Sequence, residues 1–170
     1  MRFRKVIGII LLGAVFAACS PAGEGDTGAA QTEAARPSEY VFSYNGVSVS
    51  INGSFEEIYA GLGKENSFSS EKSCAFDGDE RCYNYGSFSI TTYEDNGAER
   101  VMQISLRDDT VETPEGVCIG QSRQDVISAY GEGDGNDFFM DYKGEGMILS
   151  FLFKDGTVSD IRYLTTVTKK

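Results

Sequence analysis

Hydrophobic and polar residues alternate over short stretches of residues 40–168. Alternation with a period of two is typical of strands that bury one face of a sheet. Turn-forming pairs, among them Asn45 with Gly46 and Asp155 with Gly156, separate these stretches. Short turns between consecutive strands indicate antiparallel pairing. The expected strands are 74–76, 81–85, 88–93, 101–106, 138–142, 147–154 and 158–166.

A repeated segment precedes most of the strands in each half of this region. The stretch VSINGSFEEIYAGLG at 49–63 aligns without a gap on VCIGQSRQDVISAYG at 117–131, at a constant offset of 68 residues. Ser54 and Ser122 occupy the position of a helix N-cap, and a glycine ends each segment. Glu57 completes the spacing of a capping box after Ser54, whereas the second segment carries Asp at this position.

The repeat predicts an α+β fold of two tandem repeats, each a short helix packed on an antiparallel β-sheet of three to four strands. The first repeat covers residues 40–112 and the second covers residues 113–168. We expect the helices over 54–62 and 122–130. In the first of these, apolar residues recur at i, i+3, i+4 and i+7, which is the spacing of one helical face.

Two motifs carry a family resemblance, IGQSRQDVISAYG and FLFKDGTVSDI. A capped short helix followed by antiparallel strands, twice over, resembles the tandem repeat of beta-lactamase inhibitor protein and of similar domains in lipoproteins of Gram-positive bacteria. The resemblance covers residues 45–166. It implies a module that binds a partner, and no inhibitory residue can be carried over to this chain by motif.

The N-terminal segment has the organisation of an export signal. Three basic residues precede an uncharged apolar run over 6–18, which is too short to span a bilayer. Small residues lead directly to Cys19. This arrangement resembles the lipobox of bacterial lipoproteins, whose cysteine is lipidated and becomes the new N-terminus. We therefore predict a signal peptide over 1–18 and lipidation of Cys19. The alternative is a plain secretion signal that is cut near a cysteine.

Residues 19–39 are rich in Gly, Ala, Ser, Thr and acids, and we interpret them as a flexible tether. Removal of the signal leaves 12 basic and 26 acidic residues, a net charge of −14. Such a surface repels nucleic acid and anionic lipid headgroups. The membrane contact expected is therefore the N-terminal lipid alone, with the protein on the extracytoplasmic face of the cell membrane.

Candidate catalytic chemistry is sparse. The sequence contains no histidine, which excludes the usual serine and cysteine triads and most zinc sites, and IGQSRQ lacks the spacing of a nucleophile elbow. The acidic loops at 77–80 and 132–137 do not match the spacing of an EF-hand. We expect no cofactor and no metal. A pair of carboxylates in a cell-wall glycoside hydrolase is the enzymatic alternative.

Three cysteines remain in the exported chain besides Cys19, and an oxidising compartment allows two of them to pair. Cys74 and Cys82 flank a short turn-like stretch, so a bridge between them is favoured. Cys118 could pair with either one, and three reduced, buried thiols are a further alternative.

Strand alternation suggests a binding surface in the first repeat. In MQISLR, Met102, Ile104 and Leu106 are expected to pack under the helix, leaving the alternate residues outward. Tyr93 would then lie on the open face, where exposed aromatic and arginine side chains suit partner contacts. The candidate partner-binding residues are Tyr93, Gln103, Arg107, Tyr83 and Tyr85. We thus expect a lipid-anchored, non-catalytic binding module whose partner is a protein or the cell wall.

Overall fold

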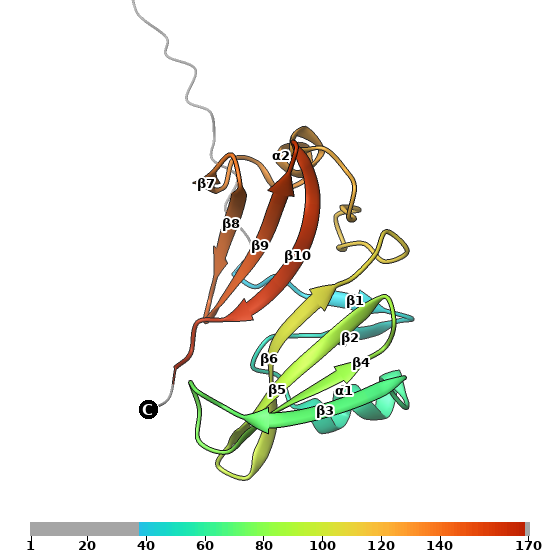
Figure 1. Cartoon of the computed structure of the whole chain (residues 1–170), viewed down its shortest axis with the longest axis vertical. Coiled ribbons are helices and arrows are strands. Elements are labelled where there is room, and N and C mark those ends of the chain that lie inside the picture. The colour runs from blue at the N-terminus through green and yellow to red at the C-terminus, as the bar shows by residue number, and fades with distance from the viewer. Residues whose placement is uncertain (1–37, 169–170) are drawn as a thin grey trace, which may run out of the picture. The chain divides into compact units, whose positions relative to one another are not determined.

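The computed structural model describes residues 38–168. The predicted signal peptide, Cys19 and residues 19–37 of the predicted tether lie outside the described residues. Within 38–168 the chain is mostly antiparallel β-structure with two short helices (Figure 1).

Eight strands form one continuous antiparallel sheet in the order β3-β4-β5-β6-β10-β9-β8-β7. Strands β3 to β6 form one half of this sheet and β7 to β10 form the other (Figure 1). The strand bounds are β3 Ser67–Lys72, β4 Asp79–Asn84, β5 Phe88–Asp95, β6 Ala98–Leu106, β7 Asp134–Asn136, β8 Phe139–Gly144, β9 Met147–Lys154 and β10 Thr157–Thr165.

The predicted fold class is wrong, because the two halves do not have separate sheets. Strand β6 pairs with β10 from Ile161 opposite Leu106 to Leu164 opposite Gln103. This pairing satisfies backbone groups that two separate sheets would leave exposed at their edges. The chain is therefore one eight-stranded sheet with a small hairpin and two helices, not two tandem helix-on-sheet repeats.

The two helices of the repeated segment are present. Helix α1 spans Phe55–Leu62 and helix α2 spans Arg123–Tyr130, so the predicted helices are confirmed. Their capping is the reverse of the expectation: Ser122 and Asp125 form a reciprocal capping box, whereas the Ser54 side chain makes no cap hydrogen bond. The shorter Asp side chain reaches the N-cap backbone N–H in α2, at 2.9 Å.

Most of the expected strands are present, but the edges of the sheet differ from the prediction. Residues 74–76 lie in a loop, and the strand before it is β3 instead. Every residue of β3 is exposed, so its sequence SFSSEK has no buried face to produce an alternating pattern. Polar edge strands of this kind limit unwanted pairing with other chains.

The N-terminal hairpin packs against both halves of the sheet. Strands β1 (Phe42–Tyr44) and β2 (Val47–Val49) pair through the predicted Asn-Gly turn, in which both turn residues have positive φ. The Phe42 ring lies 5.1 Å from Phe88 of β5 and 6.1 Å from Tyr163 of β10, measured between centroids. A single hydrophobic core therefore extends across the seam between β6 and β10.

Candidate functional site

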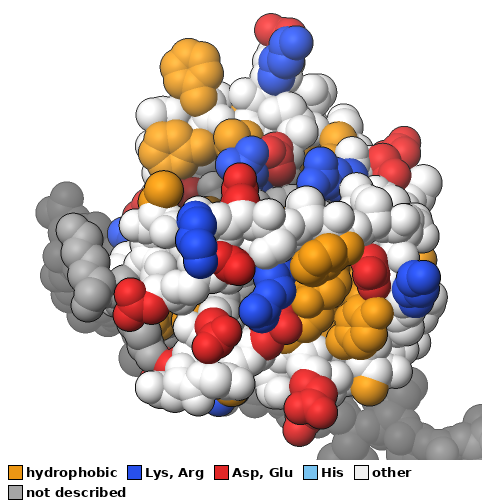
Figure 2. Space-filling model, turned by 60° about the horizontal axis from the view of Figure 1, so that its bottom comes forward, with side chains coloured by type: hydrophobic (Ala, Val, Ile, Leu, Met, Phe, Trp, Pro, Cys, Tyr) orange, Lys and Arg blue, Asp and Glu red, His pale blue; other side chains and the backbone are white. Residues whose placement is uncertain are grey.

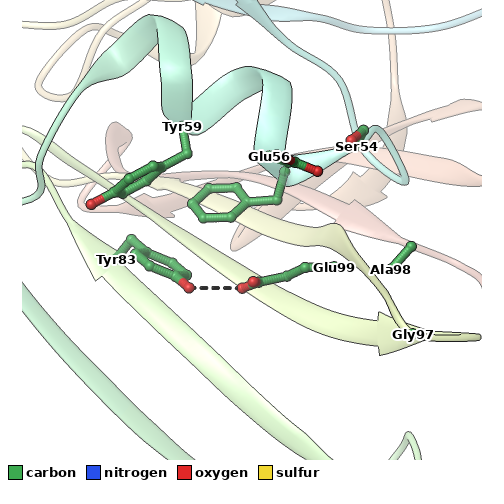
Figure 3. Close-up of a pocket in the computed structure, with 8 residues that line it drawn as sticks. Ser54, Glu56, Tyr59, Tyr83, Gly97, Ala98 and Glu99 are labelled. Atoms are coloured by element: carbon green, nitrogen blue, oxygen red, sulfur yellow. Dashed lines mark hydrogen bonds between the residues drawn. The ribbon is translucent and has the colours of Figure 1, made fainter.

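A hollow of about 560 Å³ opens beside the start of α1, and we call it the helix-side hollow. It lies between the helix, strand β4 and the turn that joins β5 to β6. Its lining residues are Ser54, Phe55, Glu56, Tyr59, Tyr83, Gly97, Ala98 and Glu99 (Figure 3). Hydrophobic side chains gather at the end of the molecule that carries α1 and β3, among acidic and basic ones (Figure 2).

Aromatic rings packed at tilted and edge-to-face angles lie at the helix-side hollow. Phe55 and Tyr59 are four residues apart and therefore lie on one face of α1. The ring of Phe55 lies 4.3 Å from that of Tyr83, and the ring of Tyr59 lies 5.9 Å from it, between centroids. Phe68, which is opposite Tyr83 in the strand register, adds a ring at 5.1 Å and is 51% exposed.

Glu99 is the most heavily hydrogen-bonded carboxylate of the helix-side hollow. Its Oε1 accepts a hydrogen bond from the Tyr83 hydroxyl at 2.9 Å and one from Thr92 Oγ1 at 2.5 Å. Arg81 Nη1 lies 3.4 Å from its Oε2. Burial, reinforced by the hydrogen bond to Glu99, raises the pKa of Tyr83, so this phenol stays a donor at neutral pH.

Tyr59 has an equivalent arrangement on the helix. Its hydroxyl donates to Glu65 Oε2 at 2.9 Å, and this hydrogen bond is the main reason that the pKa of Tyr59 is raised. Figure 3 shows Tyr59 descending from the helix toward Tyr83, with Glu56 beside Ser54 at the helix start. Both tyrosines thus direct their hydroxyls to carboxylates, and Glu56 adds an exposed carboxylate.

The opposite face of the sheet has two further hollows, of about 400 and 340 Å³, which share Gln103. Together they form what we call the open-face groove. Gln103 and Arg107 line the first hollow together, as strand alternation predicts for this face. Arg107 Nη2 donates to Ser89 Oγ at 3.1 Å, and Arg162 is ion-paired with Asp160.

A bulge in β6 explains why one residue of the predicted apolar row lies on the other face. Thr91 pairs with Gln103 and Thr92 pairs with Val101, so Met102 is an extra residue in β6. Val101 is buried instead, and Met102 is half-buried and lines the open-face groove. The expectation is confirmed for Ile104 and Leu106, which are both buried.

The predicted exposure of Tyr93 is wrong, because the side chain is only 3% exposed. Phe76, from the loop between β3 and β4, stacks on its ring at 4.1 Å between centroids. The Tyr93 hydroxyl donates to Asn52 Oδ1 at 3.4 Å. A loop that folds over the sheet thus covers the residue that alternation alone places in solvent.

The remaining candidate residues, Tyr83 and Tyr85, both pack against the core on the helix side of the sheet and not on the face of Gln103 and Arg107. Tyr83 lines the helix-side hollow, whereas Tyr85 stacks on Phe88, and burial raises the pKa of Tyr85 to about 12. The five candidates therefore do not form one surface. Glu56, Tyr59 and Glu99 are additions that the strand pattern does not indicate.

The cysteines are free thiols in the described structure, and the favoured bridge between Cys74 and Cys82 is not formed there. Cys74 is exposed, and Cys82 lines the open-face groove. Burial raises the pKa of Cys118, which keeps this thiol protonated at neutral pH. Among residues 38–168, no three metal-ligating side chains come together.

Comparison with known proteins gives a likeness of fold only. The sequence matches no protein-family model and no curated protein. The fold is similar to that of an extracellular protein containing an SCP domain from Bacillus anthracis, with a TM-score of 0.51 and 14% identity over 68% of this chain and 44% of that protein. The chain thus spans less than half the length of that protein.

Two other solved structures are less similar to the fold. A DUF4309 family protein from Bacillus subtilis has a TM-score of 0.43 and 14% identity over 76% of this chain and 88% of that one. A cysteine-rich secretory protein from Staphylococcus aureus has a TM-score of 0.42 and 12% identity over 77% of this chain and 48% of that one. In the described part of the chain, neither helix is long and apolar enough to cross a membrane.

The burial of Tyr93 can be tested by comparing the stability of alanine variants at Tyr93 and at the exposed Arg107. Tyr93→Ala is expected to lower the free energy of unfolding by about 3 kcal/mol, because it leaves a cavity under Phe76. Arg107→Ala is expected to change this free energy by less than about 0.5 kcal/mol. Urea unfolding measures both values, and equal losses in the two variants would contradict the placement of Tyr93.

Proposed function

We propose that this protein is a lipid-anchored binding module on the extracytoplasmic face of the cell membrane, and that its helix-side hollow contacts a protein or cell-envelope partner. One observation carries the proposal. The aromatic side chains of Tyr59 and Tyr83 line an open hollow that also has carboxylates, and the half-exposed ring of Phe68 packs on Tyr83.

Rings of this kind suit binding because they supply a large contact area at little cost in conformational entropy. Tyr83 is already held by Phe55 and by Glu99, so it is ordered before a partner arrives. Order in the free protein reduces the entropy that association would otherwise cost. The Tyr83 ring is therefore preorganised for contact with a partner.

The same geometry favours binding over glycoside hydrolysis. A hydrolase needs one carboxyl group to donate a proton and a second to act as base or nucleophile. Glu99 is instead surrounded by three donors, from Tyr83, Thr92 and Arg81. These contacts engage both carboxylate oxygens of Glu99, so its role is to hold Tyr83, Thr92 and Arg81 in place. We therefore assign no catalytic residue to the hollow and keep the hydrolase as the alternative.

The proposed location rests on the N-terminal segment. The basic head, the apolar run and Cys19 together support export followed by lipid attachment. The Bacillus anthracis protein of similar fold is described as extracellular, which agrees with an extracellular location. A single diacylglycerol group would then hold the domain at the membrane, since its acidic surface has no affinity for anionic lipid.

Anchoring is tested by replacing Cys19. Cys19→Ala removes the thiol that would carry the lipid, so the protein is expected in the medium or as an unprocessed precursor. Cys74→Ala, which changes an exposed thiol, is the matched control and is expected to stay with the membrane. Fractionation of cells followed by mass measurement distinguishes the forms. A Cys19→Ala protein of mature size in the membrane fraction would exclude lipid anchoring at this residue.

Partner contact at the helix-side hollow is tested by photocrosslinking on intact cells. A photoreactive phenylalanine analogue at Phe68 lies at the aromatic cluster, whereas the same analogue at Phe138 lies on the turn between β7 and β8 and is 75% exposed. We expect a discrete adduct from position 68 and none of that mass from position 138. The same adducts from both positions, or none from position 68, would overturn the proposal.

A further inference from the structure

The helix-side hollow has the electrostatic character of a cation site. Glu56 and Glu99 line it, and Glu65 accepts a hydrogen bond from the hydroxyl of Tyr59, which also lines it. A phenol that donates to a carboxylate becomes richer in electrons, which strengthens the negative potential at its ring face. Cations are attracted to such ring faces, most strongly where the site is partly desolvated.

The nearest resident cation is Arg81, which is already paired with carboxylates, one of them Glu99 of the hollow, so Glu56 is the lining carboxylate that the structure leaves available to a partner. Arg81 lies 3.4 Å from Glu99 and 3.7 Å from Glu94, as measured between nitrogen and oxygen, so two carboxylates share its charge. Among the described residues, the cation recorded over a ring is Arg123, which lies 4.9 Å from the centroid of Phe153 and belongs to the other half of the sheet. The rings of Tyr59 and Tyr83 thus have no such resident cation.

We propose that the helix-side hollow binds a basic segment of a protein partner, with a lysine or arginine side chain held against Tyr59 and Tyr83 and its charge facing Glu56. This inference rests on the proposed function and names the chemistry of the partner. Charge complementarity supports a protein segment of this kind, because the chain has 26 acidic and 15 basic residues. The surrounding field therefore attracts basic partners and directs their approach.

The first turn of α1 provides a matched pair of variants. Glu56 and Glu57 are both acidic, both exposed and both in this turn, so each has the same effect on net charge and a similar one on the helix dipole. Glu56 lines the hollow and Glu57 does not. If Glu56 contacts the partner directly, Glu56→Gln weakens binding more than Glu57→Gln does. If only the overall negative charge attracts the partner, the two variants weaken binding equally.

The test is a titration of the full-length protein in non-ionic detergent, at about physiological salt so that long-range attraction is screened. The ligand is an amidated peptide of alternating lysine and glycine, and the comparison peptide has glutamine in place of lysine. Chemical shifts of the tyrosine rings report binding at the hollow. We expect saturable shifts with the lysine peptide and about tenfold weaker binding of the glutamine peptide.

Glu56→Gln is expected to weaken binding of the lysine peptide about threefold, while Glu57→Gln leaves it within about 1.5-fold of the original protein. Tyr59→Leu, which keeps apolar volume but removes the ring, should also weaken it about threefold, and Tyr59→Phe should retain most of the affinity. Circular dichroism and the melting temperature check that each variant is folded.

Equal affinity for the two peptides, or equal losses from Glu56→Gln and Glu57→Gln, would overturn the inference. Saturation of the hollow by a neutral cell-wall oligosaccharide, with no response to the lysine peptide, would also overturn it. In either case a position-specific adduct at Phe68 on cells would leave the proposed binding function intact. Loss of that adduct together with an unresponsive hollow would reject both.

Discussion

The pairing of β6 with β10 is the interaction on which the rest of the structure depends. Each strand is the last of its half of the sheet, and without the other it would leave a row of backbone donors and acceptors unpaired. Their side chains on the covered face, Ile104 and Tyr163, lie opposite each other and are both fully buried. The seam is thus stabilised by backbone hydrogen bonds between β6 and β10 and by burial of side chains in the core.

The N-terminal hairpin and the residues after it reinforce this seam. Asn52 donates from Nδ2 to the Gly146 carbonyl at 3.1 Å and accepts at Oδ1 from Thr165 Oγ1 at 2.7 Å, so it contacts the far half of the sheet. Its backbone N–H donates to the Val101 carbonyl of β6 at 2.8 Å. Helix α1 begins two residues after Gly53, whose carbonyl accepts a hydrogen bond from the Val101 N–H, so the start of the helix is attached to β6, one of the two strands of the seam.

Local elements of this fold could be predicted from the sequence, whereas their partners could not. The spacing of Phe55 and Tyr59 and the closing Gly63 are sufficient to indicate α1, because these signals act within one turn of the chain. Alternation likewise indicates β5, and an almost continuous apolar run before the Asp155-Gly156 turn indicates β9. The sequence pattern does not say which strands of different halves pair, so it predicts a separate sheet for each repeat, whereas β3 to β10 form one continuous sheet.

In the candidate site, too, local features could be predicted from the sequence, whereas contacts between distant segments could not. Alternation correctly predicts that Gln103 and Arg107 share one face at the end of β6. The bulge at Met102 reverses the alternation for the residues of β6 that precede it. The burial of Tyr93 depends on Phe76 in a loop whose path the sequence does not indicate. Glu99 becomes the acceptor for Tyr83 only through pairings that place β4, β5 and β6 side by side.

Native-state hydrogen exchange tests the central claim, that one cooperative sheet spans both halves and supports the hollow. The slowest amides of β5 and β6 are expected to exchange with the same free energy as those of β9 and β10, because neither half can open without breaking the seam. Their common value should equal the global free energy of unfolding. A clearly lower value for β8 to β10, with β4 to β6 still protected, would show that the halves unfold separately and would contradict the account.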